Sequence, residues 1–366
     1  MQLPTLTLIA APYGLGPASK AIAVAHASKG TYLCTFVGSQ AACTIAANTN
    51  LFDHIEKIDY SSQYGSANIS CQNAMHTIFI NTTRFISNRA ALPGKLYMVD
   101  TLAWMRTSPP TGILHLQKYY AQAYLFTRLA PSIISLGNTC EVEPIIVDPT
   151  QDATLPSSAT LSPRILVQVG GMGSPATIQD SGKKYLDYLV TNLQSLEADV
   201  TLILPPQFPQ ELQSQGKIQL AVATPLSIGS LIRRSDLVLT TSGIEFMYEC
   251  AARRIPMLFL PPFNATQEKQ LFHLAQRTPT AVLFPMSADI SKHKFEDLDK
   301  RTQFVQTDGQ RGMWQRQFHS IFSKLQHLST RRLNSIAPQI RGDQGALFAS
   351  SSFGGAQYIV ESIRNG

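Results

Sequence analysis

The sequence predicts an α/β protein with two Rossmann-like domains that face each other across a cleft. Short apolar runs alternate with helical segments along its 366 residues, which is typical of parallel strands joined by right-handed crossovers. The alternation begins twice, each time with an apolar run and a glycine turn. A stretch rich in Pro, Ser, Thr and Asp separates the two starts and is predicted to be a linker. We expect a first domain at 1–148, the linker at 149–163, a second domain at 164–340 and a C-terminal segment at 341–366.

The first half opens with an apolar run, a glycine turn that contains Gly16 and an alanine-rich helix, as nucleotide-binding units do. Asp100 ends a later apolar run, which would place its side chain at the carboxyl edge of a parallel sheet. Residues 68–86 are ambiguous, although a helix is favoured there. The predicted strands are 6–11, 32–37, 54–58, 96–100 and 132–136, and the predicted helices are 18–28, 40–47, 68–86 and 113–129.

The second half opens with the apolar run 165–169 and a turn that contains Gly170, Gly171 and Gly173. A final helix at 351–364 is expected to cross back to the first domain. The other predicted strands are 200–204, 218–222, 237–240, 256–260 and 281–283, and the helices are 177–193, 227–233, the segment after Gly243, 267–275 and 312–332.

Composition indicates a well-packed globular protein, with 44% apolar and 15% charged residues. No apolar run reaches the roughly 18 residues that cross a bilayer. The N-terminus lacks a basic segment and is interpreted as a first strand rather than a signal peptide. Five scattered cysteines without a Cys-x-x-Cys pair favour a reducing compartment. We expect a cytoplasmic protein, with peripheral membrane contact left open.

The net charge of +6 is concentrated near the end of the chain. From Lys300 onward, nine Lys and Arg residues stand against three acidic ones, so this segment holds the whole excess. Two interpretations are open: a solvated helical face, or attraction for an anionic partner.

The stretch from Thr240 to Pro261 predicts an anion site. An apolar run ends at Thr240, a tight turn of Thr241, Ser242 and Gly243 follows, and a helix begins. Such a turn presents backbone N–H groups and the positive end of a helix dipole at the carboxyl edge of the sheet, where a diphosphate can bind. Glu249, two helical turns further on, has a carboxylate that can accept from a pair of hydroxyls.

These residues resemble the donor-site signature of inverting glycosyltransferases with the GT-B fold. The likeness is to the enzymes that add N-acetylglucosamine to a lipid-linked muramyl precursor and to macrolide and plant UDP-sugar transferases. It covers roughly 164–275 and also includes Asp236 and the Gly170 turn. A looser likeness to cytosylglucuronate-synthase-related proteins rests on 99–105. The matching signature residues are Ser242, Gly243, Glu249, Pro256, Pro261 and Gln267.

The resemblance implies metal-independent transfer of a sugar, with inversion, from a nucleotide-sugar that is expected to be UDP-linked. The acceptor would be a small molecule or a lipid-linked compound, no cofactor beyond the co-substrate is implied, and no nucleic acid partner is expected. The nucleobase would lie over the backbone around 224–226. The predicted donor-binding residues are Gly16, Lys20, Gly171, Gly173, Thr241, Ser242, Gly243, Glu249 and Gln267.

Asp100 is the predicted general base, because a carboxylate at a strand's carboxyl end points into the cleft. The alternative is that Asp100 caps a helix that begins at Thr101. Many relatives carry His where Pro17 stands, and proline cannot accept a proton. His26 is interpreted as a packed or surface histidine.

Several alternatives remain for the other residues and for the function. Ser242 and Glu245 match a capping box, in which the helix end would be closed by its own side chains. Glu249 would otherwise be an exposed carboxylate paired with Arg253, and Lys20 a solvated lysine. The same fold would also suit a nucleotide-sugar hydrolase or 2-epimerase, or a non-catalytic protein that binds a nucleotide or sugar.

Overall fold

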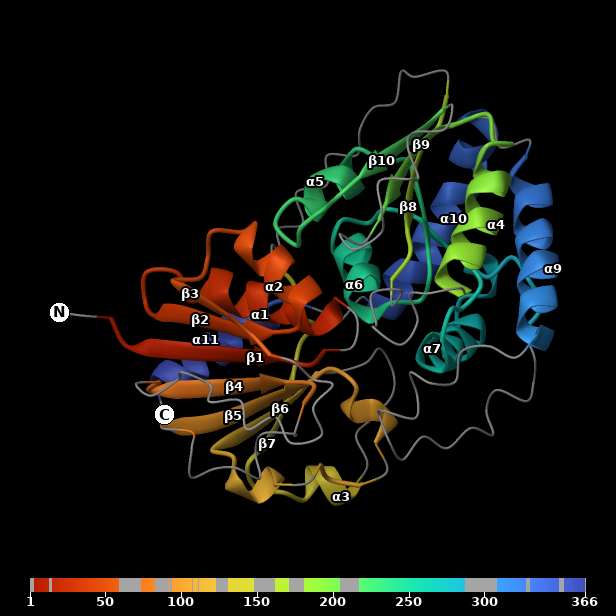
Figure 1. The fold of residues 1–366 in the computed structure, drawn as a ribbon. Coiled ribbons are helices and arrows are strands. Elements are labelled where there is room, and N and C mark those ends of the chain that lie inside the picture. The colour runs from red at the N-terminus through yellow and green to blue at the C-terminus, as the bar shows by residue number, and fades with distance from the viewer. Residues whose placement is uncertain are drawn as a thin grey trace. The chain divides into compact units, whose positions relative to one another are not determined.

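The chain forms two compact units, each built on its own parallel sheet (Figure 1). Unit 1 comprises Met1–Pro149, Thr224–Leu226 and Ser351–Gly366, and unit 2 comprises Thr150–Ala223 and Ser227–Ser350. The structure is a computed structural model, and it describes residues 3–12, 15–58, 74–82, 92, 94–106, 108–110, 112–122, 131–147, 162–170, 181–204, 217–286, 308–326, 330–348 and 352–365.

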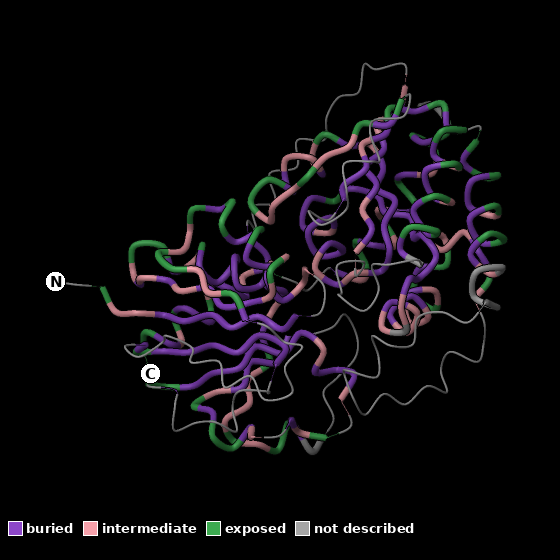
Figure 2. Tube along the Cα trace, in the orientation of Figure 1, coloured by how far each residue is buried: buried purple, intermediate pink, exposed green. Residues whose placement is uncertain are grey.

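Unit 1 contains a seven-stranded sheet in the order β3-β2-β1-β4-β5-β6-β7, with every neighbouring pair parallel. The register places Leu6 opposite both Cys34 and His76. Central strands are buried almost throughout, as both faces of a parallel sheet are covered (Figure 2). The strands are β1 Thr5–Ala10, β2 Leu33–Gly38, β3 His54–Lys57, β4 His76–Ile80, β5 Lys95–Asp100, β6 Lys118–Gln122 and β7 Thr139–Val142.

Helices α1 (Gly16–Ala27), α2 (Gln40–Ala47) and α11 (Gly355–Asn365) supply apolar residues to one core of unit 1. The C-terminal helix α11 packs against α1, which confirms that the chain returns to its first half. Gly355 makes this return possible, because a side chain there would lie 2.9 Å from Cγ1 of Ile145. A second core includes Phe79, Met98 and Tyr119 from the strands and residues of the connections.

Three predictions for the first half are wrong. Within 68–86 the structure has a buried central strand, β4, where we favoured a helix. Instead of a helix at 113–129, it has a 3₁₀ turn, η3 (Ile113–His115), and then the strand β6. The predicted strand 132–136 is the short helix α3 (Pro131–Ile134). β4 consists largely of β-branched and aromatic residues and β6 contains two tyrosines, and such residues suit a pleated, buried surface.

Unit 2 contains a five-stranded parallel sheet in the order β10-β9-β8-β11-β12. Its strands are β8 Arg164–Gln168, β9 Asp199–Ile203, β10 Ile218–Ala221, β11 Leu237–Thr240 and β12 Met257–Phe259. Its helices are α4 Ser181–Leu193, α5 Ile228–Arg233, α6 Ile244–Ala252, α7 Ala265–Ala275, α9 Asp308–Leu325 and α10 Thr330–Phe348.

Two details of unit 2 differ from prediction. The helix expected at 312–332 is α9, which ends at Leu325 and is followed by a second helix, α10. The strand expected at 281–283 is reduced to one bridge between Val282 and Phe259, preceded by the 3₁₀ turn η4 (Pro279–Ala281). Among the described residues, no helix is both long and apolar enough to cross a membrane.

Candidate functional site

Three neighbouring strands of unit 2 bring the predicted donor residues together. β11 lies between β8 and β12, so the carboxyl ends of these parallel strands meet at one edge of the sheet. The segments that leave this edge contain Gly170 after β8, the Thr241–Gly243 turn after β11, and Phe263 after β12. The edge of such a sheet is where ligands of open α/β folds bind.

Gln267 ties the three segments to one another. Its Nε2 donates to the carbonyl oxygen of Gly170 at 2.7 Å and to Oγ1 of Thr241 at 3.2 Å. Its Oε1 accepts from the backbone N–H of Phe263 at 2.7 Å. The residue is only 4% exposed, and its own N–H donates to the side chain of Asn264, which caps α7. The amide that we expected on sugar hydroxyls therefore holds the protein's own turns.

Thr241 and Ser242 face inward. Oγ1 of Thr241 accepts from the N–H of Gly170 at 3.0 Å, and the Ser242 hydroxyl donates to the carbonyl oxygen of Gln267 at 2.6 Å. Both residues are completely buried. Their side chains fix the shape of the turn, and a ligand at this edge would meet the backbone rather than the hydroxyls.

The capping box predicted for α6 does not form. Gly243 is the N-cap residue, and its backbone is extended, with φ −72° and ψ 124°. Ser242 lies one residue before the N-cap, and α6 has no side-chain cap; the Ser242 hydroxyl donates to Gln267. Among the described residues, a Cβ atom added at Gly243 would meet nothing within 4 Å, so these residues leave room beside this turn. The first N–H groups of a helix have no intrahelical partner and suit an anion, whereas Glu245 in the first turn of α6 adds a carboxylate that opposes one.

Glu249 and Arg253 form a buried ion pair on α6. Oε2 of Glu249 lies 2.5 Å from Nη1 of Arg253, and the two residues are 7% and 3% exposed. The pairing with Arg253 is confirmed, but the expectation that such a pair would be exposed is wrong. A buried carboxylate needs a partner of this kind, since its burial without one is costly.

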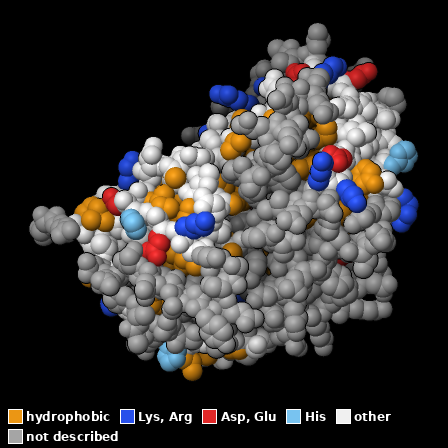
Figure 3. Space-filling model, viewed as in Figure 1, with side chains coloured by type: hydrophobic (Ala, Val, Ile, Leu, Met, Phe, Trp, Pro, Cys, Tyr) orange, Lys and Arg blue, Asp and Glu red, His pale blue; other side chains and the backbone are white. Residues whose placement is uncertain are grey.

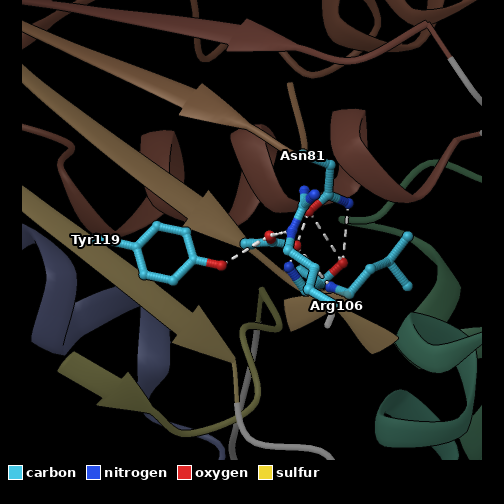
Figure 4. Close-up of polar contacts among 6 residues, drawn as sticks. Asn81, Arg106 and Tyr119 are labelled. Carbon is cyan, nitrogen blue, oxygen red and sulfur yellow. Dashed lines mark hydrogen bonds and ion pairs between the residues drawn. The ribbon is translucent and has the colours of Figure 1, made fainter. Parts of the chain in front are cut away.

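A second polar cluster lies at the carboxyl ends of β4 and β5 in unit 1 (Figure 4). Asp100 is 0% exposed, and its Oδ1 accepts from the N–H of Leu102 at 2.9 Å. Its Oδ2 accepts from the Tyr119 hydroxyl at 2.8 Å and is bonded to Nε of Arg106. No helix begins at Thr101, so the alternative that Asp100 caps one is wrong: the carboxylate bonds the N–H of Leu102, and the 3₁₀ turn η2 (Ala103–Met105) that follows has no side-chain cap.

The environment of this cluster fixes its protonation. Burial, and then the negative charge of Asp100, raise the pKa of the Tyr119 phenol well above its ordinary value, so the phenol remains a donor. Burial opposes the charge of Arg106, yet Asp100 and Tyr119 raise its pKa, so the guanidinium stays cationic. Asn81, at φ 56°, accepts from the N–H of Thr101 at 2.8 Å and closes the cluster. A general base must reach the acceptor, and this buried carboxylate favours a structural role.

Lys20 is neither a solvated lysine nor placed for a surface phosphate. It is 0% exposed, and its Nζ donates to the carbonyl oxygen of Ile145 at 2.6 Å. Gly16 is the first residue of α1 and is half-buried, and His26 is exposed in the last turn of that helix. Gly171 and Gly173 lie outside the described residues.

The described part of the chain contains no group of three His, Cys, Asp or Glu side chains that could hold a metal ion. An Asp-x-Asp pair, Asp297 and Asp299, lies outside it. On the face drawn in Figure 3, the described Lys and Arg side chains are scattered and gather in no single patch. The described cations after Lys300 are divided between the units, with Arg364 in unit 1 and Arg316, Lys324, Arg332 and Arg341 in unit 2.

Comparison with known proteins adds to this geometry. No family model and no curated protein match the sequence. The spinosyn forosaminyltransferase SpnP matches with a TM-score of 0.57 and 10% identity, over 100% of this chain and 99% of that one. A UDP-glucosyltransferase from Polygonum tinctorium capable of glucosylating indoxyl matches with a TM-score of 0.54 and 11% identity, over 100% of this chain and 99% of that one. MurG from Acinetobacter baumannii matches with a TM-score of 0.52 and 12% identity, over 99% of this chain and 100% of that one.

At this level of identity the likeness concerns the fold alone. The two parallel sheets, the returning helix α11 and the full-length matches agree with one another, and the expected fold class is confirmed: the chain has the GT-B fold of glycosyltransferases.

Proposed function

We propose that this protein is a glycosyltransferase that moves a sugar from a UDP-linked donor to an acceptor, with inversion and without a metal. One observation carries the proposal: in a chain with the GT-B fold, Gln267 and Thr241 hold the ends of β8, β11 and β12 together beside the uncapped start of α6. Preorganised N–H groups at such an edge stabilise the charge that develops on a leaving diphosphate.

The predicted donor residues of unit 2 each have a proposed role. The backbone of the Thr241–Gly243 turn and the dipole of α6 would bind the diphosphate, and the turn with Gly171 and Gly173 would add backbone contacts. Glu249 would accept from the ribose hydroxyls. Gln267 and the side chains of Thr241 and Ser242 would act by holding this edge in shape, because their polar atoms bond within the protein. We leave Lys20 out, since its ammonium is buried on Ile145.

The reaction follows from these roles. The acceptor oxygen forms a bond to the anomeric carbon of the sugar, and the bond from that carbon to the phosphate oxygen breaks. The electron pair leaves with the nucleoside diphosphate, whose negative charge the α6 N-terminus stabilises. The acceptor's proton passes to a general base, a role that the burial of Asp100 does not favour.

Nucleotide release tests this proposal. The purified protein is incubated with UDP-, GDP- and dTDP-linked sugars, with and without cell extract, and free nucleotide is measured. We expect UDP release that requires the extract, which supplies the acceptor. Release without extract would indicate a hydrolase, and thermal stabilisation by UDP without turnover would indicate a binding protein. No effect of any nucleotide would overturn the proposal.

A further inference from the structure

We propose that Arg253 is a positioning residue for the donor, which acts by fixing the Glu249 carboxylate, and that Gly229 exists to make room for its guanidinium. This inference rests on the proposed function, because it concerns how the nucleotide's ribose is bound. The three residues belong to unit 2, with Glu249 in α6, Arg253 at its C-cap and Gly229 in the first turn of α5.

Arg253 holds both the backbone and the side chain of Glu249. Its Nη1 donates to the Glu249 carbonyl oxygen at 2.9 Å and to Oε2 at 2.5 Å. One nitrogen therefore fixes the direction of the carboxylate relative to the axis of α6. Charge-assisted bonds of this kind are among the stronger ones in proteins, and both residues are nearly excluded from water.

A glycine at position 229 is explained by the close approach of Arg253 and not by an unusual backbone conformation. It lies in a helix without a positive φ, where glycine costs about 1 kcal/mol relative to alanine. A Cβ atom at this position would clash with the guanidinium, approaching its Cζ and Nε to 2.9 Å. The missing side chain lets the Arg253 head lie directly against α5.

This arrangement prepares Glu249 for a diol. The Arg253 bond holds one oxygen of this buried carboxylate, and a carboxylate has about four acceptor sites, more than this bond uses. Because the carboxylate is already fixed, less conformational entropy is lost when the ribose binds. Arg253 is thus expected to strengthen donor binding without touching the reacting atoms.

The test measures the dissociation constant for UDP by calorimetry and the melting temperature, on the full chain. Arg253→Met is expected to weaken UDP binding about tenfold, and Arg253→Lys by less, because lysine keeps the charge but lacks the fork. Gly229→Ala is expected to weaken binding about threefold or more, since the flexible guanidinium moves before the helix does. Gly345→Ala in α10 is the matched control: its new Cβ meets no atom of the described part of the chain within 4 Å, and UDP binding should not change.

Glu249→Gln separates the inference from the proposed function. We expect it to weaken UDP binding about tenfold, since it loses hydrogen bonds to a charged group, and we expect Arg253→Met to add no further loss in that background. If the natural protein does not bind UDP, or Glu249→Gln has no effect, the proposed donor site falls. If Glu249→Gln weakens binding but Arg253→Met, Arg253→Lys and Gly229→Ala do not, the positioning role alone is overturned.

Kinetics give a further distinction. If Arg253 positions the donor, Arg253→Met raises the KM for the nucleotide-sugar while kcat changes by less than about twofold, because uniform binding is lost. A purely structural role would lower the melting temperature of Arg253→Met and leave KM unchanged, which would contradict the inference. If Arg253→Met does not fold, Arg253→Lys and Gly229→Ala decide the matter.

Discussion

The side-chain amide of Gln267 donates to the carbonyl oxygen of Gly170 at 2.7 Å, although 97 residues separate the two along the chain. This bond closes the edge of the unit 2 sheet at which we place the donor diphosphate. The amide also bonds Thr241 and Phe263, so one side chain satisfies groups on three segments. The position of this edge therefore depends on a residue that need not touch the substrate.

Replacing Gln267 by alanine should be costly for stability. The variant would leave the buried N–H of Phe263 and the carbonyl oxygen of Gly170 without this partner, at about 1–3 kcal/mol for each group. We expect the free energy of unfolding in urea to fall by about 2–4 kcal/mol. Gln315→Ala is the control, since that amide bonds Tyr188 at an exposed site, and its loss should be below about 0.5 kcal/mol. Equal effects of the two variants would contradict this role.

Arg254 follows α6 in a left-handed conformation, with φ 55°. Glycine adopts this conformation without steric cost and is the usual residue after a helix. We expect Arg254→Gly to raise the free energy of unfolding by about 0.5–1 kcal/mol. Arg234→Gly is the matched control: Arg234 is also an exposed arginine at a helix end, but its φ is −84°, so the same change should destabilise. Destabilisation by both substitutions would refute the explanation.

Strands β8 and β11, which have a clear apolar run in the sequence, were predicted correctly, and β6, which lacks one, was not. In unit 2, β8 and β11 are short apolar runs, each followed shortly by a glycine. These two local signals were enough to locate both strands in the sequence. β6 reads Lys-Tyr-Tyr-Ala-Gln, and its tyrosines suit a helix face as well as a strand. Burial between β5 and β7 decides its structure, and that contact is not local in sequence.

The signature named residues that the structure brings close together, but it did not give their bonds. Ser242 and Gln267 follow the neighbouring strands β11 and β12, and the Ser242 hydroxyl donates to the carbonyl oxygen of Gln267. The signature could not show that Gln267 bonds Gly170, since that pairing follows from the register of β8 and β11. Gly229 was overlooked, although a glycine inside a predicted helix is a signal that something packs closely against it.

His76 should make the protein sensitive to acid. It is 4% exposed between the rings of Tyr32 and Tyr97, and burial, followed by the charge of Lys95, lowers its pKa. Below its ordinary pKa of about 6.5, the unfolded chain binds a proton that the native state does not, so stability falls as the pH falls from there to the folded-state pKa. The slope from this residue is at most about 1.4 kcal/mol per pH unit.

His76→Phe keeps an aromatic ring in place and removes the titration. We expect the free energy of unfolding of this variant to depend less on pH between about pH 6.5 and 5 than that of the natural protein. His273, whose pKa burial also lowers, would retain a part of the dependence. His26→Gln serves as the control, because His26 is exposed. An unchanged slope in His76→Phe would show that His76 is protonated in the native state as easily as in the unfolded chain.

Substitution of Asp100 tests whether its carboxylate has a structural or a catalytic role. Asp100→Asn removes the charge opposite the Arg106 guanidinium, whose side chain is 13% exposed, and breaking a buried pair in this way costs about 3–5 kcal/mol. We expect a loss of that size in urea unfolding. Tyr119→Phe should cost less, about 1.5–3 kcal/mol, because it removes one bond to a charged group. Tyr188→Phe, at an exposed site, is the control and should be nearly neutral.

The same Asp100→Asn protein should be assayed for UDP release per folded molecule. A general base contributes about 10²–10⁴-fold to turnover, whereas a buried structural carboxylate acts on the fraction of folded protein. We therefore expect stability to fall by the full amount while turnover of the folded fraction falls by less than about tenfold. Normal stability with turnover reduced a hundredfold would instead make Asp100 the base, and its carboxylate would then have to become accessible when the acceptor binds.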